Sequence, residues 1–431
     1  MKRLILFFIF INFGLLYGYV IDHIDAKINI TGTQKKVVHT VQMKIENDAK
    51  EFYFSYPIQE ESEILPILLS LKNSKFYRVY LKNKRVFFIV SNVRKNEKLT
   101  FNISYKTINN QPFLQVQKIY IPHFKNNFQA NIKVSVDKDW FIFSKNTSLK
   151  EQQYRWKGKV SHKDFSDYLW LSIKEANFEI SMQNYIFSTE PIESLNLFLP
   201  KYFKDGDIKV KKITFESRPK NAKIIQNNNN TAFAFRFEKT QDFVATMKAE
   251  IYNSINQLKY DSLNPKDFES KSQKPYLKQL AQHILQTNQE DPPYIAIAKW
   301  LNHTIKYNEK YMGYHMDTEE ILRLKSGVCE HYAQVYNDLM QSIDIPSVFV
   351  TGMGFNPIKK SFEFHAWNLV FVDKKWIPID ATWGLFSGIL PVSHIFLYVG
   401  YQPLMMYETY EVKISETHSE TKHKIKFIPQ K

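Results

Sequence analysis

The stretch "SGVCEHYAQVYNDLM", residues 326–340, contains the only cysteine of the 431-residue chain, Cys329. Ser326 and Gly327 interrupt the helical pattern before it, and the apolar residues after it recur at three- and four-residue spacing. This spacing predicts a new helix with Cys329 in its first turn. Unpaired amide groups and the positive end of the helix dipole favour the thiolate there, which is the nucleophilic form of the side chain.

Two further stretches supply the groups that a nucleophilic thiol needs. They are "FEFHAWNLVFV" (362–372) and "KKWIPIDATWG" (374–384), and their patterns predict two strands joined by a tight turn. Neighbouring strands lie about 4.8 Å apart, which can bring His365 on the first strand close to Asp380 near the end of the second. The sequence therefore predicts a thiol, an imidazole that takes its proton and a carboxylate that orients the imidazole.

Together with "DIPSVFVTG" (344–352), these stretches resemble the successive signatures of the transglutaminase-like superfamily. This papain-related group includes transglutaminases, bacterial cysteine peptidases and kyphoscoliosis-peptidase-like proteins. The resemblance covers roughly residues 280–385. It implies that Cys329 is the catalytic nucleophile, His365 the general base and acid, and Asp380 the residue that orients the histidine. It also implies a helix that carries the cysteine and packs against a small antiparallel sheet.

Each of these residues also has a structural interpretation when it is taken alone. A lone cysteine is often a buried small hydrophobe, and an aspartate before Thr382 often caps a turn. His315, His331 and His394 lie in the same region, but their spacings match none of the usual zinc patterns. The three ordered motifs favour catalysis, and we predict neither a metal nor another cofactor.

An oxyanion hole is a further requirement of papain-like chemistry, because charge develops on the carbonyl oxygen under attack. The resemblance implies an upstream side chain that assists the cysteine amide in this role. The sequence leaves three candidates open, all of them tyrosines: Tyr307, Tyr311 and Tyr314.

The rest of the chain predicts a multidomain protein. Residues 19–260 show period-two alternation rich in β-branched and aromatic residues, which predicts one or two β-sandwich-like modules. The polar stretch 261–276 is a predicted linker. Residues 277–400 are helical in pattern and then stranded, which predicts an α+β transglutaminase-like catalytic domain. The tail, residues 401–431, is either one edge strand or disordered.

The amino-terminal residues predict export. Lys2 and Arg3 precede an apolar run from Leu4 to Leu16, a pattern typical of a secretory signal peptide over residues 1–18. An uncleaved anchor is the alternative interpretation. Both predict a periplasmic or secreted protein, and the single cysteine means that packing rather than an internal disulfide stabilises it.

The formal net charge of +15 comes from lysines scattered through the chain. A solvated lysine-rich surface is the favoured interpretation, and weak attraction to anionic surfaces or acidic substrates is the alternative. Zinc-finger, RNP-like and Walker motifs are absent from the sequence, so we expect no nucleic-acid partner. The sequence does not fix the oligomeric state.

The favoured hypothesis is an exported thiol enzyme that acts on amide bonds of proteins or peptides through a thioester acyl-enzyme. Water as the acceptor gives a peptidase or amidase, which we favour, and a lysine amine gives transglutaminase cross-linking. A hypothesis of another class is a non-catalytic peptide- or glycan-binding module on the same fold.

Overall fold

The computed structural model describes residues 18–32, 34–58, 68–71, 77–108, 113–144, 153–161, 165–198, 209–218, 223–226, 232–255, 263–268, 274–400 and 417–428. The described chain is mostly β-sheet with a few helices. It divides into two compact units. Unit 1 comprises Met1–Ile142 and Leu149–Leu171, and unit 2 comprises Phe143–Ser148 and Ser172–Lys431. Residues 1–17, most of the predicted signal peptide, lie outside the described part.

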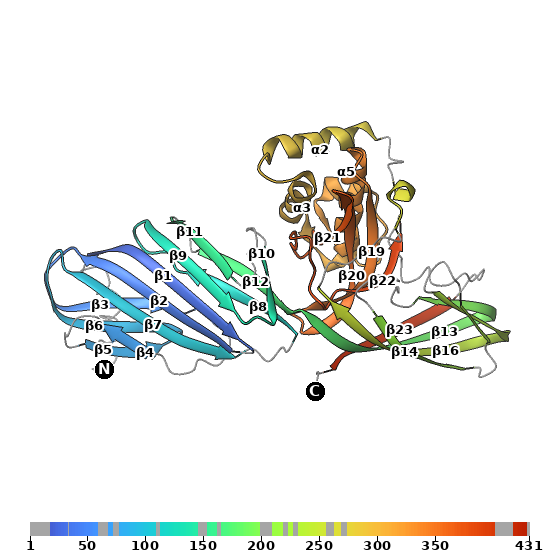
Figure 1. Ribbon diagram of the computed structural model, residues 1–431, viewed down its shortest axis with the longest axis horizontal. Helices are drawn as coiled ribbons and strands as arrows, with labels where there is room; N and C mark the ends of the chain where they lie inside the picture. The colour runs from blue at the N-terminus through green and yellow to red at the C-terminus, as the bar shows by residue number, and fades with distance from the viewer. Residues whose placement is uncertain are drawn as a thin grey trace, which may run out of the picture. The chain divides into compact units, whose positions relative to one another are not determined.

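Unit 1 consists of strands alone in its described part (Figure 1). A six-stranded sheet has the order β11-β9-β1-β2-β7-β4, and two three-stranded sheets have the orders β3-β6-β5 and β10-β12-β8. The bounds are β1 (Tyr19–Thr31), β2 (Gln34–Ile45), β3 (Ala49–Pro57), β4 (Leu68–Leu71), β5 (Tyr77–Lys82), β6 (Arg85–Val93), β7 (Lys98–Ile108), β8 (Leu114–Ile121), β9 (Phe128–Val136), β10 (Trp140–Ser144), β11 (Gln153–Val160) and β12 (Phe165–Ile173).

Alternation along these strands builds the core of unit 1. In β1, Ile24, Ala26 and Ile28 are buried, whereas Lys27 between them is exposed. Aromatic rings then join two of the sheets. The ring centroid of Phe101 on β7 lies 5.3 Å from that of Phe54 on β3 and 4.6 Å from that of Phe88 on β6. The buried face of the six-stranded sheet therefore packs against the β3-β6-β5 sheet.

Unit 2 contains a four-stranded antiparallel sheet with helices on one face (Figure 1). The strands are β19 (Ser347–Asn356), β20 (Ser361–Val372), β21 (Lys375–Ile379) and β22 (Ile395–Gly400). The helices are α2 (Pro275–Thr287), α3 (Pro293–Thr304), α4 (Thr318–Leu324) and α5 (Cys329–Ser342). Their shared core includes Leu301 of α3, Tyr336 and Leu339 of α5, and Val370 and Ile379 of the strands.

A second sheet belongs to the same unit. Its order is β14-β16-β13-β23, and β15 pairs with β16. The bounds are β13 (Glu175–Phe198), β14 (Lys209–Arg218), β15 (Lys223–Gln226), β16 (Ala232–Ser254) and β23 (Thr417–Ile428). Within the predicted tail, residues 417–428 thus form a strand, which pairs antiparallel with β13. Residues 172–254 group with the helical part of the chain rather than with unit 1.

Part of the predicted linker is packed against the four-stranded sheet. Residues Pro265–Phe268 form the 3-10 helix η2, and Leu263 before it is buried. The indole N–H of Trp376 donates to the Leu263 carbonyl oxygen at 3.0 Å. The Phe268 ring contacts the same tryptophan edge-on at 5.9 Å between centroids. These described residues of the segment are therefore attached to the sheet that follows them.

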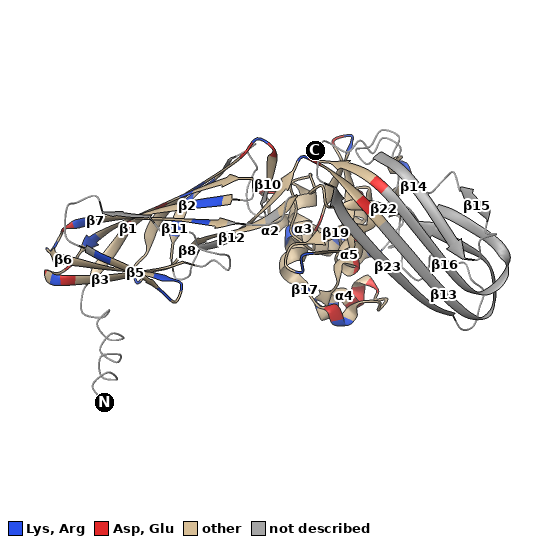
Figure 2. Cartoon of the chain, turned by 90° about the horizontal axis from the view of Figure 1, so that it is seen from below, with Lys and Arg blue, Asp and Glu red and all other residues tan. Residues whose placement is uncertain are grey.

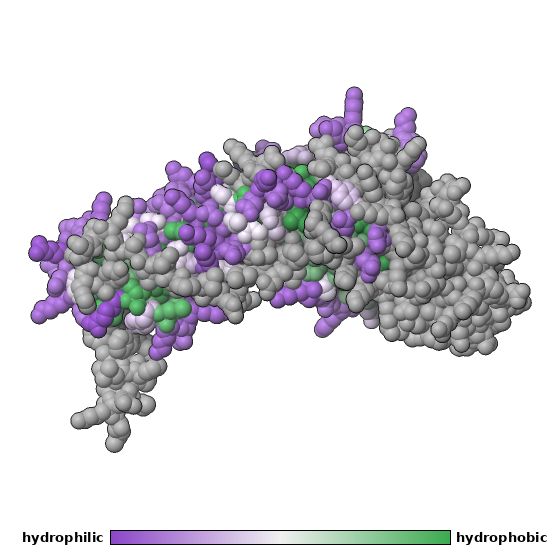
Figure 3. All heavy atoms as spheres, turned by 60° about the horizontal axis from the view of Figure 1, so that its bottom comes forward, coloured by the Kyte–Doolittle hydropathy of each residue, from purple (hydrophilic) through white to green (hydrophobic). Residues whose placement is uncertain are grey.

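Two further features of the described part are the polarity of its surface and the apolar character of its helices. In the view of Figure 3 the described surface is mostly hydrophilic. Among the described residues, we find no helix with the length and apolar character needed to cross a membrane.

Candidate active site

Cys329 is the first residue of α5, and a closely packed turn holds it there. The ring of His331 is buried, with Nδ1 accepting from the Val328 amide at 3.0 Å and Nε2 donating to the Tyr314 carbonyl at 2.9 Å. A Cβ at Gly327 would lie only 2.7 Å from the His331 Cβ, so glycine is required next to this ring. The "GVCEH" sequence therefore fixes the start of the helix. The Cys329 side chain is half-buried and packs against Ala333, Phe349 and Ala366.

The hairpin of β20 and β21 brings the other two predicted residues together. Its turn uses Asp373 and Lys374, both with positive φ, as expected for a two-residue turn that matches strand twist. His365 Nε2 donates to Asp380 Oδ2 at 2.7 Å. Cys329 lies close enough to the same imidazole to help raise its pKa, and Nδ1 is the ring nitrogen that Asp380 leaves open. The structure thus brings Cys329, His365 and Asp380 into one line of contacts.

Asp380 is completely buried and receives three hydrogen bonds. Its Oδ1 accepts from the Trp383 amide at 3.0 Å, and its Oδ2 accepts from His365 and from His394 Nε2, the latter at 3.1 Å. The backbone of Asp380 also pairs with that of Leu385 in both directions, at 3.1 and 2.9 Å. The carboxylate is therefore held at both oxygens and at its backbone.

Burial and pairing oppose each other in setting the protonation of this cluster. Burial alone would lower the pKa of His365, but the charge and hydrogen bond of Asp380, with a contribution from Cys329, raise it to about 10. Burial would raise the pKa of Asp380, yet the two histidines hold it well below its usual range. Burial lowers the pKa of His394. The resulting arrangement is an imidazolium and carboxylate pair with a neutral His394 as donor.

His394 is the site residue that sequence analysis did not find, since it appeared there only as a metal candidate. It lies just before β22, and its position depends on a distant strand. Asn253 Nδ2 of β16 donates to the carbonyl oxygens of Val392 at 2.6 Å and His394 at 3.0 Å. The Val392 amide in turn donates to Ser172 Oγ at 3.2 Å. Contacts across such sequence separations leave no local pattern, so no motif near His394 could have indicated its role.

Aromatic rings enclose the imidazole of His365. The Trp383 ring stacks on it with centroids 3.8 Å apart and an interplanar angle of 12°. A Cβ at Gly354 would come within 2.5 Å of the Trp383 ring, so glycine leaves the space that this stack occupies. A tryptophan face attracts a cation, which favours the protonated imidazole. Trp367 and Trp376 are also buried.

The three candidate tyrosines for the oxyanion hole lie in different surroundings. Tyr307 is on β17 (Lys306–Tyr307), which pairs parallel with β18 (Ser326–Gly327) and so lies beside the turn before Cys329. Partial burial, with the nearby Cys329, raises the pKa of Tyr307, which keeps the hydroxyl protonated as a donor. Tyr311 packs against the helical core, and Tyr314 is 64 % exposed. Tyr307 is therefore the best placed of the three.

One group of described residues has the donor geometry for a metal ion. His365, Asp380 and His394 offer ligand atoms that lie within 4.8 Å of one another. Both histidine Nε2 atoms already donate to the same carboxylate oxygen, however, and an ion there would have to replace both bonds. The carboxylate and both Nε2 atoms are satisfied as they stand, whereas His394 Nδ1 is buried without a hydrogen-bond partner among the described residues.

Comparisons with known proteins identify the segment that carries this site. Residues 278–381 match the family model described as the transglutaminase-like superfamily. Over 130 residues the chain is 30% identical to kyphoscoliosis peptidase of Mus musculus, a match that spans 27% of this chain and 19% of the mouse protein. The chain thus covers less than a fifth of that relative's length.

Two solved structures match this chain at low sequence identity and with TM-scores below 0.5. A proposed cysteine protease from Cytophaga hutchinsonii has 14% sequence identity and a TM-score of 0.45, with 60% of this chain and 92% of that chain covered. A proposed protease from Parabacteroides distasonis has 10% identity and a TM-score of 0.22, with coverage of 90% and 72%. The assignment comes from the family model, whose match contains Cys329, His365 and Asp380. Residues 278–381 of this chain are a transglutaminase-like domain.

Proposed function

We propose that this protein is a cysteine-dependent enzyme that acts on amide bonds of proteins or peptides through Cys329, His365 and Asp380. The observation that carries the proposal is the buried His365 ring, held at 2.7 Å by Asp380 on one nitrogen and partnered by the Cys329 side chain. A structural cysteine would need neither a histidine partner nor a carboxylate behind it. A nucleophile needs both.

The reaction follows from these contacts. The proton of Cys329 resides on His365 as the imidazolium, so the sulfur attacks the carbonyl carbon as the thiolate and a tetrahedral intermediate forms. The carbon–nitrogen bond then breaks as the imidazolium delivers the proton to the leaving amine, which leaves a thioester on Cys329. Water gives a proton to His365 and attacks the thioester, which releases the acid and restores the Cys329 sulfur as the thiolate beside the imidazolium. The Cys329 amide and the Tyr307 hydroxyl are the proposed donors to the carbonyl oxygen.

Hydrolysis is the reaction that we favour, since it needs only water as the acceptor. The same thioester would transfer its acyl group to a lysine amine if the cleft admits one. The geometry of the three residues is common to both outcomes, so the choice of acceptor is a matter for experiment.

The chemistry can be tested on the full chain because Cys329 is its only thiol. We expect iodoacetamide to modify Cys329 selectively and to abolish cleavage of a peptide library that is active with the unmodified protein. Cys329→Ala should lower turnover by about 10³-fold or more. The readout is mass spectrometry of new amino termini, with a labelled primary amine present to detect transfer.

The outcomes of that experiment separate the hypotheses. New amino termini without amine incorporation mean hydrolysis, and amine incorporation without new termini means cross-linking. An unreactive Cys329 together with no turnover of either kind would remove the enzyme proposal and favour a binding module. Cys329→Ser serves as the matched variant, since it keeps the size of the side chain but provides a poorer nucleophile.

We further infer that the chain is exported and that residues 19–260 are β-sandwich-like. The basic and apolar amino terminus supports export, and the aromatic contacts between the β3-β6-β5 sheet and the six-stranded sheet support a sandwich in unit 1. Fractionation of cells that express the full chain tests export. Recovery of the protein with its amino-terminal segment intact in the cytoplasm would contradict it.

The ion pair predicts a pH-dependent loss of stability in Asp380→Asn. The pKa of His365 rises from 6.5 to about 10 on folding, so its contribution is complete below pH 6.5 and is lost as the pH rises through 10. The pKa of Asp380 falls from 3.8, so its contribution is present above that value and is lost in acid. We expect the variant to lower the free energy of unfolding by about 3 kcal/mol near pH 5 to 6. Urea denaturation across the pH range measures this difference, and a constant difference up to pH 10 would contradict it.

His394 is predicted to act as a positioning residue for Asp380. His394→Phe keeps a ring of similar size but removes the Nε2 donor, and hydrogen bonds to charged groups contribute about 1.5 to 3 kcal/mol. We therefore expect kcat to fall about tenfold to hundredfold with little change in KM, because the buried His394 does not contact substrate. His394→Gln, which retains a donor, should recover part of kcat. Equal kcat values in wild type and His394→Phe, measured at matched stability, would exclude this role.

A further inference from the structure

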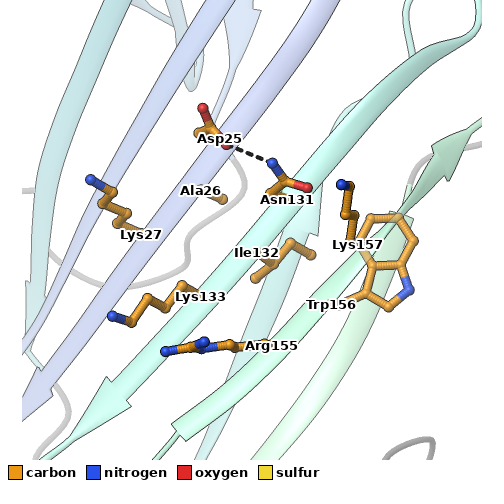
Figure 4. A pocket seen from close by; sticks show the side chains of 9 residues that line it. All are labelled: Asp25, Ala26, Lys27, Asn131, Ile132, Lys133, Arg155, Trp156 and Lys157. Carbon is orange, nitrogen blue, oxygen red and sulfur yellow. Dashed lines mark hydrogen bonds between the residues drawn. The ribbon is translucent and has the colours of Figure 1, made fainter.

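We infer that the outward face of β1, β9 and β11 in unit 1 binds an extended acidic polypeptide segment that lies along strand β11. This inference concerns binding and is independent of the amide chemistry proposed for Cys329. It starts from a shallow hollow of about 560 Å³ over the three strands (Figure 4). Four of its nine lining residues are cationic and one is acidic: Lys27, Lys133, Arg155 and Lys157 against Asp25.

Strand register sets three of the cations side by side. Lys27 of β1 pairs with Lys133 of β9, and Lys133 pairs with Arg155 of β11. All three side chains are exposed on one face of the sheet. Like charges directly opposite one another on neighbouring strands repel each other, and an anion bound over the row would be attracted to all three cations.

Asp25 offsets only a small part of this positive charge. Its Oδ1 accepts from Asn131 Nδ2 at 3.0 Å, the dashed bond of Figure 4, and lies 2.9 Å from His23 Nε2. These bonds outweigh burial and, with a smaller effect from Lys27, lower the pKa of Asp25. One carboxylate already shared among these partners leaves a surplus of cations on the face.

Protection of a sheet edge explains part of this pattern but not all of it. Lysines on an edge strand discourage unwanted pairing with other chains, and β11 ends the six-stranded sheet. That accounts for Arg155 and Lys157. Lys27 and Lys133 lie on interior strands, where no edge needs protection. Figure 2 shows basic positions in blue near the label of β11.

The spacing of the cations along β11 favours a polypeptide over other polyanions. Arg155, Lys157 and Lys159 are successive outward positions, so their spacing is about 6.6 Å, twice the rise of a strand. An extended peptide with an acidic residue at every second position has the same repeat. Within the described part of the chain, β11 pairs only with β9. A peptide added beside β11 would gain main-chain hydrogen bonds as well as charge contacts.

The probe is a fluorescent peptide of ten alternating Thr and Glu residues, titrated with the full chain at low salt and followed by anisotropy. We expect binding that weakens as salt rises, because screening reduces exposed charge contacts. Replacement of Glu by Gln should abolish binding. N-methylation of alternate backbone amides should weaken it about tenfold, because it removes strand pairing but keeps every charge.

Matched variants locate the site. Lys133→Glu combined with Arg155→Glu should raise the Kd of the peptide about tenfold or more. Lys84→Glu combined with Arg94→Glu makes the same charge change at exposed positions outside these strands and should change Kd less than about twofold. Equal losses in the two double variants would overturn the inference. Equal binding of the N-methylated peptide, or of a carboxylated polysaccharide of matched charge, would also overturn it, because the face would then be a general polyanion surface.

Discussion

The contact between His365 and Asp380 is the interaction on which the site depends. Both groups are almost completely removed from water, and an isolated charge there would be strongly disfavoured. The pair is tolerated because the carboxylate has three donors, and because the imidazole is bonded to that carboxylate and stacked against Trp383. A buried pair with unsatisfied atoms would lower stability, whereas a fully bonded one fixes two protonation states at neutral pH.

This constraint explains local sequence choices around the site. Asp380 can meet His365 only if β20 and β21 turn sharply, which two residues with positive φ accomplish. Gly354 is needed because Trp383 covers the imidazole, and Gly327 is needed because His331 closes the turn before Cys329. The signature motifs thus contain residues that let side chains pack around the site as well as the residues proposed for the chemistry. A larger residue at Gly354 would displace the Trp383 ring, and one at Gly327 would displace the His331 ring.

Local pattern and register made much of the site predictable. Helical spacing after Ser326 and Gly327 placed Cys329 at a helix start, and α5 begins at that residue. Strand alternation and a polar turn placed His365 near Asp380. The role of Tyr307 depends on a two-residue ladder with Ser326 and Gly327, which is too short to leave a pattern.

Contacts between residues far apart in the sequence could not be predicted from local patterns. His394 reaches Asp380 because Asn253, 141 residues away, holds the segment before β22. That contact also links β16 to the site, and it is one physical reason why residues 172–254 group with the transglutaminase-like domain instead of unit 1. Periodicity reports which face of a strand is buried but not which distant chain covers it. The sequence therefore predicted that this region consists of strands. It did not predict which sheet belongs to which unit.

The difference in burial between Cys329 and the other site residues indicates from which side a substrate would reach the site. His365, Asp380 and His394 are inside the protein, whereas Cys329 is half-buried. A substrate would therefore approach the sulfur, and the proton that leaves the sulfur would move inward to a ring whose far side is dry. Keeping water from that side preserves the strength of the Asp380 contact, because bulk solvent would screen it. Water for hydrolysis would then have to arrive beside the sulfur, along the path that the leaving amine has vacated, so departure of the amine and entry of the acceptor use the same opening.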